Sequence, residues 1–485
     1  MSTRIEATPW MPDARSWLLL AAVVTVGLTF NWIFAAGLMV FVFAQMARPF
    51  HFLLAFLLVV TGASFISNSG GGLTFQLSLL MSVMVFAFVC YVLNFRDRVF
   101  SLCLSPLTVP VVAFIMLSLA NAARGVLMGN HLRNLGLEFV AILGLGTSLI
   151  VANAFDAKRD LRFATIALIV IAQVASLWGF HSFAEAQTRT ANAYTVALPG
   201  IVAMLLVNMA LRSKNLATAF LWVLLSVPLF LHQLITFGRG LWTGCFAGLI
   251  VTFLVFGGRG LGARARWTRS MAVVGLIAGI GLIGAFQLVV VMGQRDLLQD
   301  AVTRLMSIGS TKEGIETRSN MIRLFEYATV IPIILSSPWV GQGLGFTFAV
   351  EEPFSRKYAD QWGVHQNYLL VWLKQGAIGL ALFIWMLWTA TAMGAREARR
   401  RSDPWESTWF ATIAAGTVFL AVFSLTNYPF AVVNEMFLLG LLWGAGMAMA
   451  RTGSLSLRWS SSPVVRTADA PRATWSQKIF PRRPR

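Results

Sequence analysis

Long apolar stretches separated by short polar segments run along most of the chain. Stretches of about twenty apolar residues are typical of helices that cross a lipid bilayer. The first two stretches are short and meet at Asn31 and Trp32. These two residues either form the tip of a helical hairpin or lie within one long tilted helix. The pattern predicts an all-α fold, a polytopic membrane helix bundle of about 12–14 transmembrane helices. The predicted spans are 17–30, 32–46, 50–67, 73–93, 106–121, 135–152, 162–180, 192–211, 216–235, 238–256, 271–292, 366–391, 408–425 and 430–450.

One long polar segment, residues 293–365, interrupts this series and carries seven basic and eight acidic residues. Within it, apolar positions recur at helical spacing after Thr317 and Ser319, either of which can cap a helix. We predict an amphipathic helix that ends near 336–338. Its apolar positions are Met321, Leu324, Phe325, Ala328 and Ile331. We expect this face to lie on the membrane domain, as a lid would.

Two strongly basic segments, 259–269 and 396–401, set the orientation of the bundle. Basic loops face the cytoplasm in membrane proteins. The two spans between these segments then cross outward and back, so 293–365 is external. The remaining short basic loops, which contain Arg48, Arg96 and Arg98, Lys158 to Arg162, and Arg212 and Lys214, all fall on the cytoplasmic side.

The sequence thus divides into four parts: 1–292 and 366–450 form the transmembrane bundle, 293–365 is the external loop, and 451–485 is a tail. The tail has eight basic residues and one acidic residue, Asp469, which is typical of a disordered cytoplasmic segment that contacts anionic lipid. No cleavage site follows the first span, so it is expected to remain as an anchor, and both chain ends are predicted to be cytoplasmic.

Composition agrees with a membrane protein, because 57% of residues are hydrophobic and only 12% are charged. The net charge of +18 arises from the short loops and the tail. Cytoplasmic loops of membrane proteins are enriched in lysine and arginine, which accounts for this charge. Nucleic acid is therefore not an expected partner. The three cysteines, Cys90, Cys103 and Cys245, have neither metal-ligand spacing nor a disulfide pattern.

Ionisable residues outside the cytoplasmic loops gather at the external ends of the spans, and four of the five histidines are among them. Ionisable groups in membrane domains usually mark function. An arginine near a helix end, however, also extends its side chain to the membrane–water interface without having any further role. A transporter or polysaccharide flippase would place such groups near the bilayer midplane. A flippase is therefore the alternative to an enzyme that acts at the external face of the membrane that the chain spans.

Several short motifs follow one another in this external region. Gly238, Arg239 and Gly240 open one span, and the long loop holds Arg318 before its amphipathic helix. Glycines at 341, 343 and 345 either present N–H groups to an anion or simply let the chain turn. His365, Asn367 and Leu369 then lead into a span that contains Gly376 and Gly379. In this order the motifs resemble the O-antigen ligase and O-antigen polymerase superfamily, over residues 185–390 or so.

This resemblance implies an integral membrane glycosyltransferase of the bacterial inner membrane with a periplasmic active site. The implied donor is a glycan on undecaprenyl pyrophosphate. The acceptor is a sugar hydroxyl, either on lipid A–core (a ligase) or on another lipid-linked glycan (a polymerase), and the two remain open. Members work without metal or other cofactor, and the chain has no Asp-x-Asp motif that would hold one.

Arginines can replace a divalent cation at a pyrophosphate, because guanidinium groups form multidentate bonds to phosphate oxygens. We predict Arg189, Arg239 and Arg318 as pyrophosphate ligands, and His365, with Arg239, as catalytic residues. Imidazole titrates near neutral pH, which suits a base for the acceptor hydroxyl. The pattern after Arg189 is degraded, and Ile322 stands where related proteins often have tryptophan. A second tier of candidates comprises Arg323, His181, His232 and Glu138.

Overall fold

The computed structural model describes residues 101–186, 197–213, 215–236, 238–256, 315–351, 358–451 and 453–456. Within these ranges the chain is almost entirely helical. The helices are α5 Thr108–Leu127, α6 Leu132–Ala154, α7 Ala157–Ala186, α8 Ala197–Arg212, α9 Leu216–Ile235, α10 Arg239–Phe256, α13 Ile315–Ser336, α14 Asn367–Arg400, α15 Pro404–Phe423, the 3-10 turn η2 Pro429–Ala431, and α16 Val433–Met449. Two antiparallel strand pairs accompany them, β1 Ser101–Leu104 with β4 Gly453–Ser456 and β2 Phe348–Glu351 with β3 Tyr358–Gln361.

The all-α membrane bundle is confirmed. Seven of the described helices are long and apolar enough to cross a membrane, and α8 and α16 are shorter apolar helices. Each predicted span from 106 to 256 and from 366 to 450 corresponds to one helix. The predicted spans at 17–30, 32–46, 50–67, 73–93 and 271–292 lie outside the described residues, as does most of the tail, so the count of about 12–14 stays a prediction.

Polar residues between the apolar runs determine where some helices begin. Asp403 caps α15 by accepting hydrogen bonds from the N–H groups of Trp405 and Glu406, and Pro404 occupies its first turn. Asn215 caps α9 in the same way, through the N–H of Ala217. These caps satisfy backbone donors that the start of a helix leaves unpaired.

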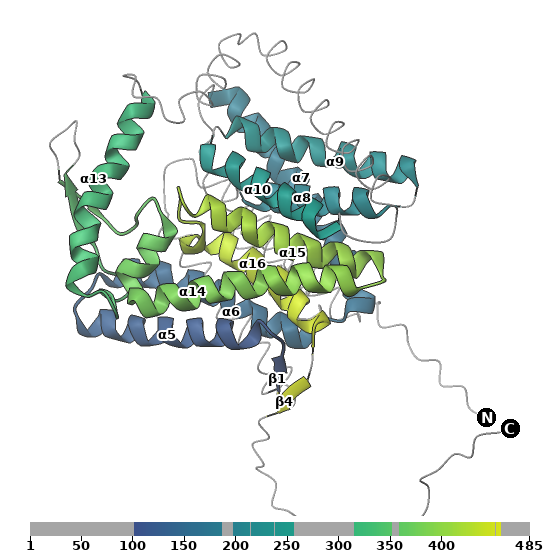
Figure 1. Ribbon diagram of the computed structural model, residues 1–485. Coiled ribbons are helices and arrows are strands. Elements are labelled where there is room, and N and C mark those ends of the chain that lie inside the picture. Colours follow the sequence, from purple (N-terminus) through teal and green to yellow (C-terminus); the bar gives the residue numbers. More distant parts are fainter. Residues whose placement is uncertain are drawn as a thin grey trace, which may run out of the picture.

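Helix α15 lies in the middle of the bundle, between α14, α10 and α8 (Figure 1). Glycines spaced four residues apart on α10 allow the close approach of α15. A Cβ atom at Gly244 would lie 2.7 Å from the carbonyl oxygen of Phe419, and one at Gly240 would overlap the hydroxyl of Thr426. Small residues at this spacing let membrane helices pack backbone to backbone. Gly440 and Gly444 of α16 approach α6 in a similar way.

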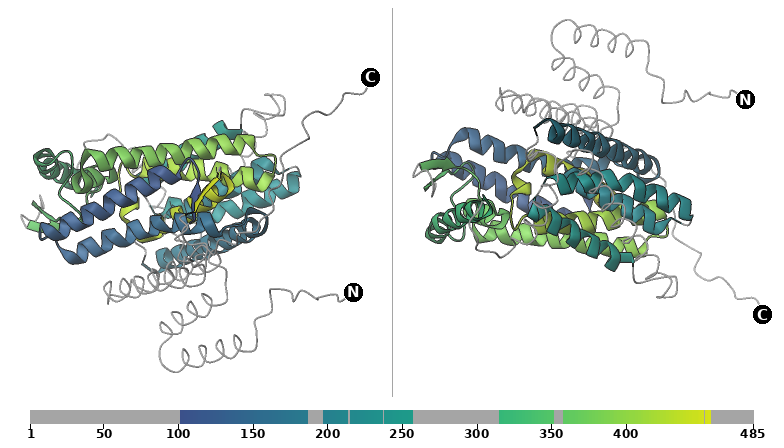
Figure 2. Two further views of the ribbon diagram at one scale, coloured as in Figure 1. Left: turned by 90° about the horizontal axis from the view of Figure 1, so that it is seen from below. Right: turned by 90° about the horizontal axis from the view of Figure 1, so that it is seen from above.

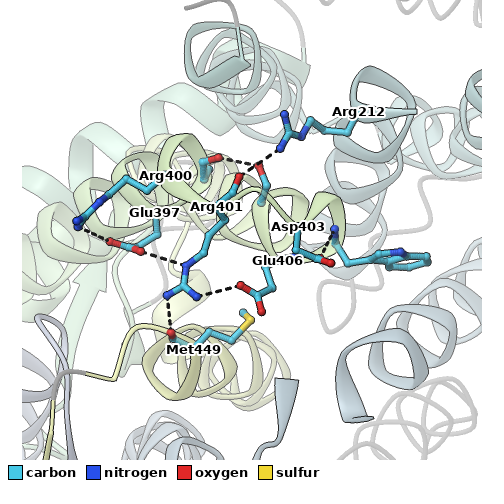
Figure 3. Close-up of polar contacts among 10 residues, drawn as sticks. Arg212, Glu397, Arg400, Arg401, Asp403, Glu406 and Met449 are labelled. Atoms are coloured by element: carbon cyan, nitrogen blue, oxygen red, sulfur yellow. Dashed lines mark hydrogen bonds and ion pairs between the residues drawn. The ribbon is translucent and has the colours of Figure 1, made fainter. Parts of the chain in front are cut away.

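The basic segments predicted to be cytoplasmic meet at one end of the bundle. Arg401, just after α14, forms ion pairs with Glu397 at 3.3 Å and Glu406 at 3.0 Å, and donates to the carbonyl of Met449 at 2.7 Å (Figure 3). Arg212 at the end of α8 donates to the carbonyl of Arg401 at 3.4 Å. Helices far apart in sequence thus end together, as alternating spans require.

The opposite end of the bundle carries α13 and the β2–β3 hairpin. Both views in Figure 2, together with Figure 1, show that α13 runs across the ends of the spans and not along them. A small separate core joins these parts. It comprises Val330 and Ile334 of α13, Phe348 and Val350 of β2, Val364, and Leu370 and Leu373 of α14.

The predicted lid helix exists, but its predicted orientation is wrong. Met321, Leu324, Phe325, Ala328 and Ile331 are exposed. The buried line runs instead through Glu326, Val330 and Ile334. The physical reason is that α13 is apolar on two sides, and only one side can contact the small core of the loop. Helix α13 also begins at Ile315, slightly before the predicted capping residues, and it ends at Ser336 as expected.

Candidate functional site

His365 and Glu326 form a close pair at the end of the bundle that carries the long loop. His365 follows β3 and precedes Gln366, the capping residue of α14. Glu326 comes from the buried line of α13. One carboxylate oxygen lies 2.7 Å from His365 Nδ1, and the other accepts the backbone N–H of His365 at 3.1 Å. Glu326 therefore fixes both the backbone and the ring of His365.

Burial differs sharply within this pair. The Glu326 side chain is 0% exposed, whereas that of His365 is 40% exposed. Of the two neutral tautomers of the imidazole, the one that carries its proton on Nδ1 can donate to this carboxylate. Nε2 then keeps its lone pair as a hydrogen-bond acceptor. The arrangement is that of an oriented base, in which one group holds the imidazole and the other nitrogen accepts a proton.

Aromatic rings stand beside the histidine. The ring centroids of His365 and Tyr428 are 5.8 Å apart, and Trp362 meets Tyr428 edge to face at 5.7 Å. Tyr327, next to Glu326 on α13, is half-buried. Burial raises the pKa of its phenol, the charge of Arg323 opposes this, and the charge of Glu326 adds to it. Tyr327 therefore stays protonated and neutral near pH 7.

The segment that follows α15 connects His365 to the start of α10. The backbone N–H of Asn367 donates to the carbonyls of Ser424 at 2.9 Å and Asn427 at 3.1 Å. The same segment contains Thr426, which Gly240 of α10 approaches closely. Arg239, the first residue of α10, and His365 therefore border the same short segment, as their predicted place at the outer ends of two spans requires.

Asn367 contributes a second polar group to this region. It is buried, and neither its side-chain oxygen nor its side-chain nitrogen has a hydrogen-bond partner in the part of the chain that the structure describes. Buried amides are usually paired, so an unpaired one is informative. Two residues from His365, its side chain therefore has an unused donor and an unused acceptor.

The other arginine candidates are placed less completely. Arg318 lies on α13 two turns before Glu326, and Arg323 lies between them, half-buried. Arg189 lies outside the described residues. The structure thus puts Arg318 and Arg323 on the helix that supplies Glu326. The roles of Arg189, Arg239 and Arg318 as pyrophosphate ligands stay predictions.

Three second-tier candidates lie on membrane spans. His232 of α9 is buried, with its ring edge to face with Phe180 of α7 at a centroid distance of 6.4 Å. His181 also lies on α7. Glu138 of α6 is buried and forms an ion pair with Lys374 of α14 at 2.7 Å. The described contacts of His232 and Glu138 are those of groups that hold helices together.

The three alternating glycines act as turns. Gly341, Gly343 and Gly345 have φ of 69°, 81° and 77°, which other residues rarely adopt. Their N–H groups donate to the carbonyl of Ser337 at 3.0 Å, the carbonyl of Lys374 at 3.0 Å and the carboxylate of Glu138 at 2.8 Å, respectively. With these donors used inside the protein, the loop does not present glycine N–H groups to an anion.

Within the described ranges, no three histidine, cysteine, aspartate or glutamate residues are grouped so that they could hold a metal ion. The chemistry available at His365 is instead that of a histidine–carboxylate pair beside arginine-bearing helices. Metal independence of the reaction stays a prediction.

Comparison with known proteins gives one family. Residues 224–384 match the family model described as O-antigen ligase. The match includes most of α9, all of α10, the long loop with α13, His365, and the first half of α14. No curated protein matches the chain. The resemblance seen in the sequence is therefore confirmed: residues 224–384 match the O-antigen ligase family, and this match supports the O-antigen ligase and polymerase superfamily.

Proposed function

We propose that this protein is an integral membrane glycosyltransferase that transfers or polymerises a glycan from an undecaprenyl-pyrophosphate carrier onto a sugar hydroxyl. The O-antigen ligase domain supports membrane glycosyltransferase activity of the ligase or polymerase type. The finer assignment rests on one observation, the His365–Glu326 pair inside that domain. In this proposal the site faces the periplasm, in a multi-pass protein of the inner membrane.

In the reaction, His365 Nε2 accepts the proton of the acceptor hydroxyl as its oxygen bonds to the anomeric carbon of the donor sugar. The bond between that carbon and the pyrophosphate oxygen breaks, and undecaprenyl pyrophosphate leaves with the electron pair. Glu326 stabilises the imidazolium that forms, as the orienting carboxylate of a catalytic triad does. Arg239, Arg318 and Arg189 neutralise the leaving pyrophosphate.

The acceptor separates the two reactions within this proposal. A ligase uses lipid A–core, and a polymerase uses another lipid-linked glycan. A strain that lacks the protein distinguishes them, because loss of a polymerase leaves single repeat units, whereas loss of a ligase leaves full polymer on its lipid carrier.

The direct test is release of undecaprenyl pyrophosphate by the purified protein in nanodiscs that contain a lipid-linked oligosaccharide and an acceptor. We expect the His365→Ala variant to lose about 10²–10⁴-fold in turnover, the usual contribution of a positioned base. Arg239→Ala is expected to lose activity as well. Arg400→Ala, at the opposite end of the bundle and 68% exposed, is the matched control and should retain it.

A second variant tests the pair itself. Glu326→Gln keeps the size of the side chain but removes its charge, so turnover should fall while the KM for the donor stays the same. Glu326→Asp keeps the charge and should recover part of the loss. Near-normal turnover of His365→Ala would contradict the proposal, and translocation of the lipid-linked glycan without cleavage would indicate a flippase.

A further inference from the structure

The exposed side of α13 forms one continuous apolar stripe. Apolar side chains recur on it every three or four residues, with the small Ala328 between Phe325 and Ile331, and they continue past the helix end. Leu324 is 59% exposed, Leu335 64% and Trp339 70%. The other large members of this stripe, which we call the α13 stripe, are Met321, Phe325, Ile331 and Val340. Soluble surfaces rarely present so long an apolar run.

The C-terminal end of the stripe lies at a definite depth in the bundle. Helix α14 ends in the basic cluster that begins at Arg396, and a helix crosses the hydrocarbon core of a bilayer in about 20 residues. Counting back from Arg396 along α14 reaches Gly376. The chain after α13 is attached there, because Ala377 N–H donates to the carbonyl of Pro338 at 2.8 Å.

This attachment places Trp339 at the outer edge of the hydrocarbon core. The indole N–H of Trp372 also donates to the carbonyl of Pro338, at 2.9 Å, and a Cβ atom at Gly376 would overlap the carbonyl oxygen of Trp339. Tryptophan is enriched at this depth in membrane proteins, where its ring lies among the lipid headgroups.

The stripe is continuous with the lipid-facing side of α14. Ile378, next to Trp339 through the hydrogen bond from its N–H to the Trp339 carbonyl at 3.4 Å, is 47% exposed. Further along this membrane span, Ile384, Trp385 and Trp388 are exposed as well. Because α13 crosses the ends of the spans (Figures 1 and 2), it runs roughly in the plane of the membrane.

We propose that α13 is an interfacial membrane helix whose stripe lies in the outer leaflet of the bilayer. Helices of this kind lie in the interface with one face among the acyl chains. The opposite side of the helix holds Glu326, so the bilayer fixes the depth of the His365–Glu326 pair at the boundary between lipid and water. That consequence concerns the proposed transferase site, whereas the position of α13 is independent of any activity.

Spin labels measure this position directly. Leu324→Cys and Leu335→Cys variants, in a background where Cys90, Cys103 and Cys245 are alanine, are labelled with a nitroxide and reconstituted in nanodiscs. Ile384→Cys, 49% exposed on α14, is the lipid control, and the exposed Ser402→Cys is the aqueous control. Relaxation by oxygen, which partitions into lipid, is compared with relaxation by a water-soluble nickel chelate.

We expect oxygen-to-nickel accessibility ratios at positions 324 and 335 that match position 384 and exceed position 402 severalfold. High nickel accessibility at both stripe positions would overturn the proposal by placing the stripe in water. Low accessibility to both reagents would overturn it by showing that protein, either another segment of this chain or a second copy, covers the stripe. Neither result would bear on the transferase assay, so the two proposals fail separately.

Discussion

A buried ion pair holds the glycine-rich turn against the bundle. Glu138 and Lys374 lie 2.7 Å apart with side chains 7% and 3% exposed. Glu138 also accepts the N–H of Gly345, and Lys374 donates to the carbonyl of Phe346. The two side chains therefore join α6, α14 and the loop at one point. Breaking such a pair leaves an uncompensated buried charge, which destabilises strongly.

We predict that Glu138→Ala lowers the free energy of unfolding by about 3–5 kcal/mol, because Lys374 loses its partner. The variant Glu138→Gln with Lys374→Gln should recover much of this loss, since both side chains stay polar and neither is charged. Steric-trap unfolding in bicelles measures both, and the transferase assay should show activity in the double variant. If Glu138→Ala abolishes transfer at unchanged stability, Glu138 belongs to the reaction as the sequence first suggested.

The sequence predicts His365 as a candidate base, but it did not predict the contact of His365 with Glu326. Glu326 is one of eight acidic residues in the long loop and stands 39 positions before His365. The one available signal was its spacing, since Glu326 shares a line with Val330 and Ile334 at intervals of four. A carboxylate in an otherwise apolar helical line needs a partner. The opposite face of α13, the α13 stripe, is also apolar. For that reason the sequence predicted that face to be the buried one, which is wrong.

At the scale of elements, α14 and the turn after α13 are in close backbone contact at Gly376. Gly376 has φ of 70° inside α14, and the chain at Trp339 fills the space where a side chain would begin. This contact holds α13 at the outer end of α14, and it depends on glycine for both conformation and room.

Gly376→Ala is therefore expected to destabilise the protein by at least about 1–3 kcal/mol, the usual cost of a strained backbone conformation. Gly136→Ala is the matched control, because nothing lies within 4 Å of a Cβ atom at that helical position in α6. The control should be neutral or slightly stabilising, since alanine favours helix over glycine. Equal stability of the two variants, measured by thermal unfolding in the same detergent, would contradict the close contact at Gly376.

Element positions were predictable wherever lipid is the solvent. The apolar range 135–152 corresponds to α6 Leu132–Ala154, and 216–235 has the same bounds as α9. Hydropathy predicts the positions of these helices, because an apolar segment that crosses a bilayer must pair its own backbone groups and therefore forms a helix. The loop was harder, because its fold depends on side-chain contacts of Val330, Phe348 and Val364 that hydropathy does not specify.

On the scale of the whole molecule, the basic cluster around Arg401 and the candidate site around His365 lie at opposite ends of the bundle. Arg212, Arg401 and their neighbours gather at one end, and His365, Arg239 and α13 lie toward the other. Counting loops predicted this separation, because alternating spans leave only two sides. It did not predict that the segment around Thr426 would join α10 to His365, since that contact depends on how α15 packs.

Sidedness is the last property that follows from this separation. Basic loops stay in the cytoplasm, so the cluster at Arg401 is expected inside and the α5–α6 turn outside. His131 in that turn and Ser402 beside the cluster are both exposed. In the alanine background, His131→Cys should react with a membrane-impermeant maleimide in intact cells, and Ser402→Cys should react only after the membrane is opened. The reverse pattern would place His365 on the cytoplasmic side, where lipid-linked glycan awaiting export would be the substrate, and would contradict a periplasmic transferase. Because one helix, α14, connects the two ends, the label at Ser402 reports on His365 without any change to the site itself.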